Sequence, residues 1–279
     1  MKTPSFTSIL VSLNDVAQLP GLLAATRHLA GKFNAQVLGL YVIPAVQIYP
    51  MMGYGAPPPT YDGNQIFFNQ HRDKVKADFE TAMKADGIEF AFQELQGRAP
   101  QIASDVADRG RAHDVIILSA SQMDGVVGFE DDFSERVVML AGRPVLVLPR
   151  NVGTTFDFGE IALGWDGGRE AARATFDAMP LLRQARRVRL VGIDVAPRGL
   201  EPSAEIAATL AHHGVKTEIT HVTSDGMSAG ETLLRTANDH GAGLLIMGAY
   251  GHSRFSEFIF GGATRHVFRN LTLPVLMSH

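Results

Sequence analysis

The sequence predicts an α/β protein built from two tandem doubly wound domains, each a five-stranded parallel sheet flanked by helices. Three observations support this fold class. The length of 279 residues is long for one hydrophobic core, because single domains usually contain about 100–200 residues. Apolar strand-like segments alternate with helical patterns, and the same succession of elements occurs twice. Two similar α/β units are therefore expected.

The first half begins with a short apolar run that is typical of a buried strand. An amphipathic helical pattern and a second apolar strand follow it. The elements predicted for this half are a strand at 8–13, a helix at 16–33, a strand at 36–42, a helix beginning near Asn64, a helix at 99–109, a strand at 114–118 and a final strand at 144–148.

The second half repeats this order closely enough to indicate the same architecture. Its predicted elements are a strand at 161–165, a helix at 170–184, a strand at 188–195, a helix at 230–240, a strand at 244–247 and a final strand at 274–277. Strands that alternate with helices of about 10–15 residues imply right-handed βαβ units and a parallel sheet covered on both faces. Each half is expected to be one such unit.

The boundary between the halves is predicted at the polar, glycine-containing stretch 150–155. The expected domains are residues 1–150 and 156–279, divided near Gly153. One segment has no counterpart in the second half: residues 44–63 contain several glycines and a run of three prolines. We interpret it as a surface loop, and its apolar residues leave open a role in binding a partner.

The composition excludes several classes of function. Hydrophobic residues make up 46% of the chain and charged residues 19%, which argues against disorder. The net charge of -4 indicates no general attraction to nucleic acid or to an anionic membrane. The chain has no cysteine, so thiolate zinc sites and a cysteine nucleophile are excluded. The N-terminal segment is too polar for a signal peptide, and a cytoplasmic location is expected.

The stretch that points to chemistry lies between the strand at 244–247 and the last helix. Gly248 and Gly251 are expected to adopt positive φ and to let the backbone approach a ligand, while Gly261 and Gly262 open the helix with free N–H groups. Such donors suit phosphates. Thr264 lies in the first helical turn, where its hydroxyl could join the amides.

Position in the fold strengthens this interpretation. In a doubly wound sheet, ligands bind beyond the carboxyl ends of the strands, where the strand order reverses. If the fourth strand lies beside the first, Asp166 faces Gly248 across that crevice. Its carboxylate can accept from an adenine amino group or a ribose hydroxyl, and it can equally act as a helix N-cap. The neighbouring Trp165 is expected to be a packing residue at the crevice edge.

In these residues the chain resembles the tandem universal stress proteins, whose ATP-binding members carry G-x2-G-x9-G-[S/T/N] near the C-terminus. Gly248, Gly251 and Gly261 match this spacing, whereas Gly262 replaces the hydroxyl or amide residue. The resemblance implies a Rossmann-like, adenine nucleotide alpha hydrolase-like fold and bound ATP, with Mg²⁺ coordinated by the phosphates. It implies a binding site composed of Trp165, Asp166, Ile193, Met247, Gly248, Tyr250, Gly251, His252, Gly261, Gly262, Ala263 and Thr264.

The first half departs from the motif. Residues 119–125 lack its glycines, Asn14 stands where the second half has Asp166, and Asp131 and Asp132 lie at the start of the next helix. Carboxylates at a helix N-terminus satisfy the macrodipole and repel phosphate. The first domain is therefore expected not to bind ATP and to form the structural half of an intrachain pseudo-dimer. The resemblance implies that the last strands of the two halves pair, which would cover both edges. Association of whole chains remains open.

Three functions stay under consideration. The first is an ATP-binding stress-response protein that acts as a nucleotide-dependent sensor or binding module, and the sequence shows no convincing general base for rapid hydrolysis. The second is a slow ATPase or self-phosphorylating enzyme that uses His252, Ser253 or Ser256. The third is a nucleotide-free protein that binds another protein through the 44–63 loop.

Overall fold

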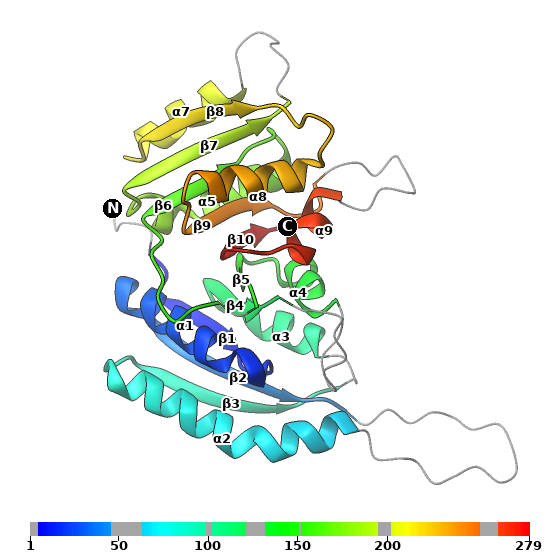
Figure 1. The fold of residues 1–279 in the computed structure, drawn as a ribbon. Helices are drawn as coiled ribbons and strands as arrows, with labels where there is room; N and C mark the ends of the chain where they lie inside the picture. Colours follow the sequence, from blue (N-terminus) through cyan, green and yellow to red (C-terminus); the bar gives the residue numbers. More distant parts are fainter. Residues whose placement is uncertain are drawn as a thin grey trace, which may run out of the picture.

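The computed structural model describes residues 5–45, 63–98, 102–120, 132–150, 152–194, 202–251 and 262–279. Ten strands form one sheet in the order β3-β2-β1-β4-β5-β10-β9-β6-β7-β8, which runs through the whole molecule (Figure 1). The first five strands of the chain therefore form one half of the sheet and the last five the other. The architecture agrees with the predicted fold class.

The first half has parallel strands and the expected order of elements. Its elements are β1 (Ser8–Ser12), the 3₁₀ turn η1 (Val16–Gln18), α1 (Leu19–Phe33), β2 (Gln36–Ile43), α2 (Gly63–Ala85), β3 (Phe90–Gln96), α3 (Ala103–Gly110), β4 (Val115–Ser119), α4 (Phe133–Ala141) and β5 (Val145–Leu148).

The second half repeats this order, again with parallel strands. Its elements are β6 (Glu160–Gly164), α5 (Arg169–Asp177), α6 (Met179–Leu182), β7 (Arg187–Ile193), α7 (Pro202–His212), β8 (Thr217–Val222), α8 (Ala229–Asp239), β9 (Leu244–Gly248), α9 (Gly262–Arg269) and β10 (Val275–Ser278). The fourth strand β9 lies beside the first strand β6, which is the neighbourhood that the predicted crevice needs.

One predicted helix is wrong in extent. The pattern from 170 to 184 is divided into α5 and α6 at Ala178. Pro180 lies in the first turn of α6, where its missing N–H removes no hydrogen bond, whereas inside one continuous helix it would remove a bond and clash with the preceding turn. The proline therefore places the break.

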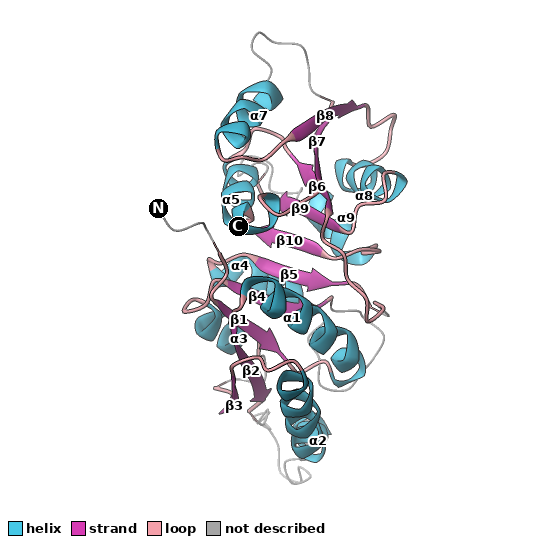
Figure 2. Cartoon of the chain, turned by 90° about the vertical axis from the view of Figure 1, so that its left-hand side faces the viewer, coloured by secondary structure: helices cyan, strands magenta, loops and turns pink. Residues whose placement is uncertain are grey.

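The two halves join through their last strands. Strand β10 pairs with β5 in antiparallel register, with Leu276 opposite Leu146, so each strand covers an edge of the other. The pairing of last strands expected from the sequence is present. The core consists of two buried clusters, one on each face of the sheet. Figure 2 shows helices on both sides of it.

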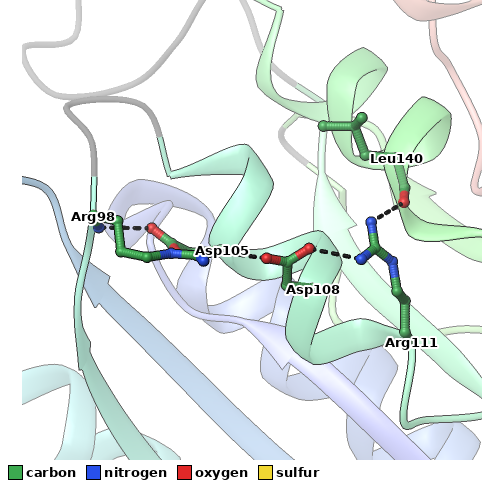
Figure 3. A network of polar contacts seen from close by, with 5 residues as sticks. All are labelled: Arg98, Asp105, Asp108, Arg111 and Leu140. Atoms are coloured by element: carbon green, nitrogen blue, oxygen red, sulfur yellow. Dashed lines mark hydrogen bonds and ion pairs between the residues drawn. The ribbon is translucent and has the colours of Figure 1, made fainter.

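A polar network ties α3 to its neighbours in the first half (Figure 3). Asp105 is 2% exposed and accepts from Arg98, with 3.0 Å between Nε and Oδ1. Asp108 pairs with both Arg98 and Arg111, and Arg111 Nη2 donates to the carbonyl of Leu140 in α4 at 3.0 Å. Because Asp105 is buried and paired, removing its partner would leave a carboxylate without compensation. The network fixes α3 against α4.

Candidate functional site

A cavity of about 230 Å³ lies at the carboxyl ends of the strands in the second half. Strands β6 and β9 are adjacent there, and their connections leave toward opposite sides of the sheet. This is the position where ligands bind in doubly wound folds. Its walls are formed by Gly164, Trp165, Asp166, Ala171, Val191, Ile193, Asp194, Ala229, Leu233, Met247, Gly248, Gly251, Gly262, Ala263 and Thr264.

The cavity gathers most of the residues that the sequence analysis singled out. Those that line it are Trp165, Asp166, Ile193, Met247, Gly248, Gly251, Gly262, Ala263 and Thr264. Tyr250 does not line it, and His252 and Gly261 lie outside the described residues, as do residues 46–62 of the predicted surface loop. The grouping comes from three strand ends and the start of α9, which are far apart in the sequence.

Several lining residues were missed by the sequence analysis. Ala229 and Leu233 come from α8, and Ala171 from α5; none of them belongs to a recognisable motif. Asp194 was missed because the predicted strand at 188–195 included it, whereas β7 ends at Ile193 and Asp194 directly follows it, at the same edge of the sheet as Asp166. The cavity is therefore more acidic than the sequence analysis indicated.

Asp166 shapes the turn between β6 and α5. Its Oδ1 accepts from the backbone N–H of Gly168 at 2.7 Å, two residues further on, which is an Asx-turn. The N-cap position of α5 is occupied by Gly168 itself, so the interpretation of Asp166 as the N-cap is wrong. The side chain is exposed and faces the cavity, so both the turn and a ligand contact are compatible with its position.

The glycines of the β9–α9 connection have a different role from the one expected. Neither Gly248 nor Gly251 has positive φ; the left-handed residue is Tyr250, with φ of 58°. A Cβ on Gly248 would lie 2.5 Å from the backbone N of Ala171, and one on Gly251 would lie 2.6 Å from Oε2 of Glu170. Close packing of the connection against the backbone of α5 therefore requires Gly248, whereas a Cβ at Gly251 would meet the end of the Glu170 side chain, which can move.

Tyr250 connects the cavity wall to the other half of the chain. Its backbone N–H donates to Oγ1 of Thr264 at 3.0 Å, and its hydroxyl donates to Oε2 of Glu135 in α4 at 2.7 Å. Burial, followed by the hydrogen bond to Glu135, raises the pKa of Tyr250 above its usual value. The phenol therefore stays protonated and acts as a donor across the junction of the two halves.

Glu170 is a buried carboxylate behind the glycine connection, with 5% of the residue exposed. Burial, the largest single influence, would raise its pKa, but the hydrogen bond from Arg169, at 2.8 Å between Nε and Oε1, its own backbone N–H and the charges of Arg169 and His279 together lower the net pKa. The group is therefore ionised at neutral pH. Its charge is compensated locally by Arg169, whose side chain reaches solvent.

At the equivalent position in the first half, the described side chains make hydrogen bonds within the protein. The strand register places Asn14 where the second half has Asp166, and Ser119 where it has Gly248. Asn14 is 1% exposed and hydrogen-bonds both backbone groups of Val42. Asp15 accepts from Ser119 across the two strand ends, at 2.6 Å between Oδ2 and Oγ. These bonds join the strand ends across the crevice position.

Trp165, metal-binding side chains and membrane-spanning helices were also considered. Trp165 packs against the core as predicted, and its indole Nε1 is buried without a hydrogen-bond partner in the described part of the protein. Within the same residues, no group of three His, Cys, Asp or Glu side chains is arranged to hold a metal ion. A search of the described helices finds none long and apolar enough to cross a membrane.

Comparison with known proteins gives one consistent result. Residues 183–279 match the model of the universal stress protein family. A universal stress protein from Synechocystis sp. is 26% identical over 146 residues, which cover 51% of this chain and 49% of that protein. The chain thus spans about half the length of this curated relative.

Solved structures extend the likeness to the whole fold. A universal stress protein from Archaeoglobus fulgidus aligns over 97% of each chain with a TM-score of 0.71 and 13% identity. A putative universal stress protein from Pseudomonas aeruginosa covers 98% of this chain and 93% of its own, with a TM-score of 0.59 and 17% identity. At these identities the structural matches establish the two-part fold only. The identity of a ligand has to be argued from the residues of the site.

Proposed function

We propose that this chain, whose residues 183–279 match the universal stress protein family, is a member of that family and that residues 156–279 form a domain that binds ATP or another adenine nucleotide. The protein would act as a cytoplasmic sensor or binding module whose conformation or choice of partner depends on the nucleotide. The observation that carries the proposal is that Asp166, Ile193 and the glycine connection meet at one cavity.

The cavity suits the nucleoside part of such a ligand. Its volume of about 230 Å³ is below the roughly 300–1,000 Å³ of pockets that enclose a complete drug-sized ligand. An apolar section formed by Val191, Ile193 and Leu233 offers a surface for a flat base, and Met247 adds a polarisable contact. The base and ribose would be enclosed there, and the phosphates would extend out of the cavity.

The start of α9 suits the phosphates. Gly262, Ala263 and Thr264 form its first turn and line the cavity, and the N–H groups of a first helical turn have no partner within the helix. Thr264 is buried, and its oxygen already accepts from Tyr250, so its hydroxyl hydrogen can donate to a phosphate oxygen. Backbone donors would thus bind the phosphates in place of the hydroxyl that Gly262 lacks.

A magnesium ion would be held chiefly by the phosphates. The described lining has two carboxylates, Asp166 and Asp194, and no lysine, arginine or histidine. An unneutralised triphosphate would be repelled by these charges, whereas Mg²⁺ bound to phosphate oxygens reduces that repulsion. The affinity for ATP is therefore expected to fall when Mg²⁺ is removed with a chelator.

The first domain, residues 1–150, would serve as the structural half of the pseudo-dimer. Its crevice position is occupied by the hydrogen bonds of Asn14 and Asp15, which a nucleotide would have to break. Breaking buried hydrogen bonds without replacing them costs about 1–3 kcal/mol for each group left unpaired. One nucleotide per chain is the expected stoichiometry. Assembly of several chains is a separate prediction.

Calorimetric titration of Mg²⁺-ATP into the wild type and into Ala229→Phe tests the proposal. Ala229 is exposed at the first position of α8 and faces the cavity, so a phenyl group there would occupy the ligand volume. Ala208→Phe is the matched control, because Ala208 is exposed on α7 and does not line the cavity. Binding at one site per chain is expected for the wild type and the control, with loss of binding in Ala229→Phe.

The other outcomes separate the alternatives. Two equal sites would refute the assignment of the first domain as degenerate. No binding by the wild type would refute the proposal in favour of a nucleotide-free interaction protein. Steady ATP turnover would favour the slow-enzyme alternative, whose candidate residues His252, Ser253 and Ser256 lie outside the described residues.

A further inference from the structure

Asp194 is a cavity residue that the nucleotide motif does not include. It is the first residue after β7 and has φ of 50°, in the left-handed region that Asp tolerates better than most side chains. Its backbone N–H donates to the carbonyl of Val222 at the end of β8, at 3.0 Å. The chain therefore turns at Asp194 while its backbone is still attached to the sheet.

The carboxylate of Asp194 is fixed in place. Its Oδ1 accepts from the backbone N–H of Ser224 at 2.9 Å, which attaches it to the β8–α8 connection. Hydrogen bonds from the side chain and then the backbone of Ser224 lower the pKa of Asp194 below its usual value, so the group is ionised at neutral pH. A fixed, charged acceptor at the cavity wall selects ligands that bring hydrogen-bond donors.

The positions of the two cavity carboxylates indicate which donor groups of a ligand they can bind. Asp166 lies two residues beyond the end of β6 and Asp194 directly follows β7, and both line the same cavity. In dinucleotide-binding α/β folds, an acidic residue about 20 residues beyond the first turn accepts from the ribose hydroxyl groups. Asp194 occupies the comparable strand end, next to the apolar contact Ile193.

We propose that Asp194 accepts hydrogen bonds from the ribose hydroxyls of the bound nucleotide and so makes the site selective for ribonucleotides over deoxyribonucleotides. This inference rests on the proposed nucleotide-binding function and adds the sugar specificity of that site. A vicinal diol offers two donors to one carboxylate, and a 2′-deoxy sugar offers one. In this arrangement Asp166 would accept a hydrogen bond from the amino group of the base.

Because Asp194 is exposed, the selectivity is expected at the lower end for hydrogen bonds to charged groups, about tenfold in dissociation constant. The test is to titrate ATP and 2′-deoxy-ATP, each with Mg²⁺, into the wild type, Asp194→Asn and Asp225→Asn. Asparagine retains an acceptor for Ser224 and tolerates the same backbone conformation, so Asp194→Asn is expected to fold. Asp225 is an exposed acid of the same connection that does not line the cavity, and it controls for the change in charge.

The inference requires about tenfold weaker binding of 2′-deoxy-ATP to the wild type and to Asp225→Asn, with the difference abolished in Asp194→Asn. Equal binding of the two nucleotides to the wild type, or an unchanged preference in Asp194→Asn, overturns the inference and leaves the proposed function intact. Failure of the wild type to bind either nucleotide overturns both.

Discussion

Gly248→Ala tests the conclusion that the glycine connection is shaped by packing. An added Cβ at Gly248 would lie 2.5 Å from the backbone N of Ala171 and 2.5 Å from the backbone C of Glu170. Real Cβ contacts are longer than 3.0 Å, and both contact atoms belong to the backbone of α5, so the strand end or the helix must move. Overpacking of this kind costs about 1–3 kcal/mol. At roughly 2–4 °C per kcal/mol, the melting temperature should fall by several degrees.

Gly262→Ala is the matched control in the same cavity. A Cβ at Gly262 meets nothing within 4 Å, and alanine favours helical backbone more than glycine does, so this variant should be at least as stable as the wild type. Thermal and urea unfolding without nucleotide, followed through Trp165, the only tryptophan, measures both variants. Wild-type stability of Gly248→Ala would refute the packing argument.

Three further variants test the junction of the halves and the effect of pH. Tyr250→Phe removes the hydrogen bond to Glu135 and should lower the free energy of unfolding by about 1–2 kcal/mol in urea titrations, and no change would exclude a contribution from this contact. Burial lowers the pKa of His28, so the folded state favours its neutral form, and stability should decrease as the pH falls below about 6.5. His28→Leu should weaken that decrease between pH 7.5 and 5.5, and an identical pH profile would contradict the assignment. Leu276→Ala truncates a fully buried side chain opposite Leu146 and should cost about 2–5 kcal/mol in the same unfolding assay, and a cost below 1 kcal/mol would show that the junction repacks freely.

The buried strands and the crevice could be predicted because their signals are local. Strands such as β4 and β9 are continuous apolar runs, and this pattern identifies strands covered on both faces. The third strands β3 and β8 were not located, because edge strands are half-exposed and their sequences carry a weaker pattern. The adjacency of β6 and β9 follows from the topology rules of doubly wound sheets, which placed Asp166 and Gly248 at one crevice.

The sequence, together with its resemblance to a known family, predicted the repeated α/β architecture, the pairing of the last strands and most of the residues around the cavity. Only the tertiary structure showed that Gly248 is required for packing against α5, that Tyr250 contacts Glu135 and that Asp194 lines the cavity. The physical reason is separation along the chain: Tyr250 and Glu135 are 115 residues apart, and no local propensity or periodicity records such a contact. Local patterns specify the elements, whereas the role of a side chain depends on the neighbours that packing brings to it.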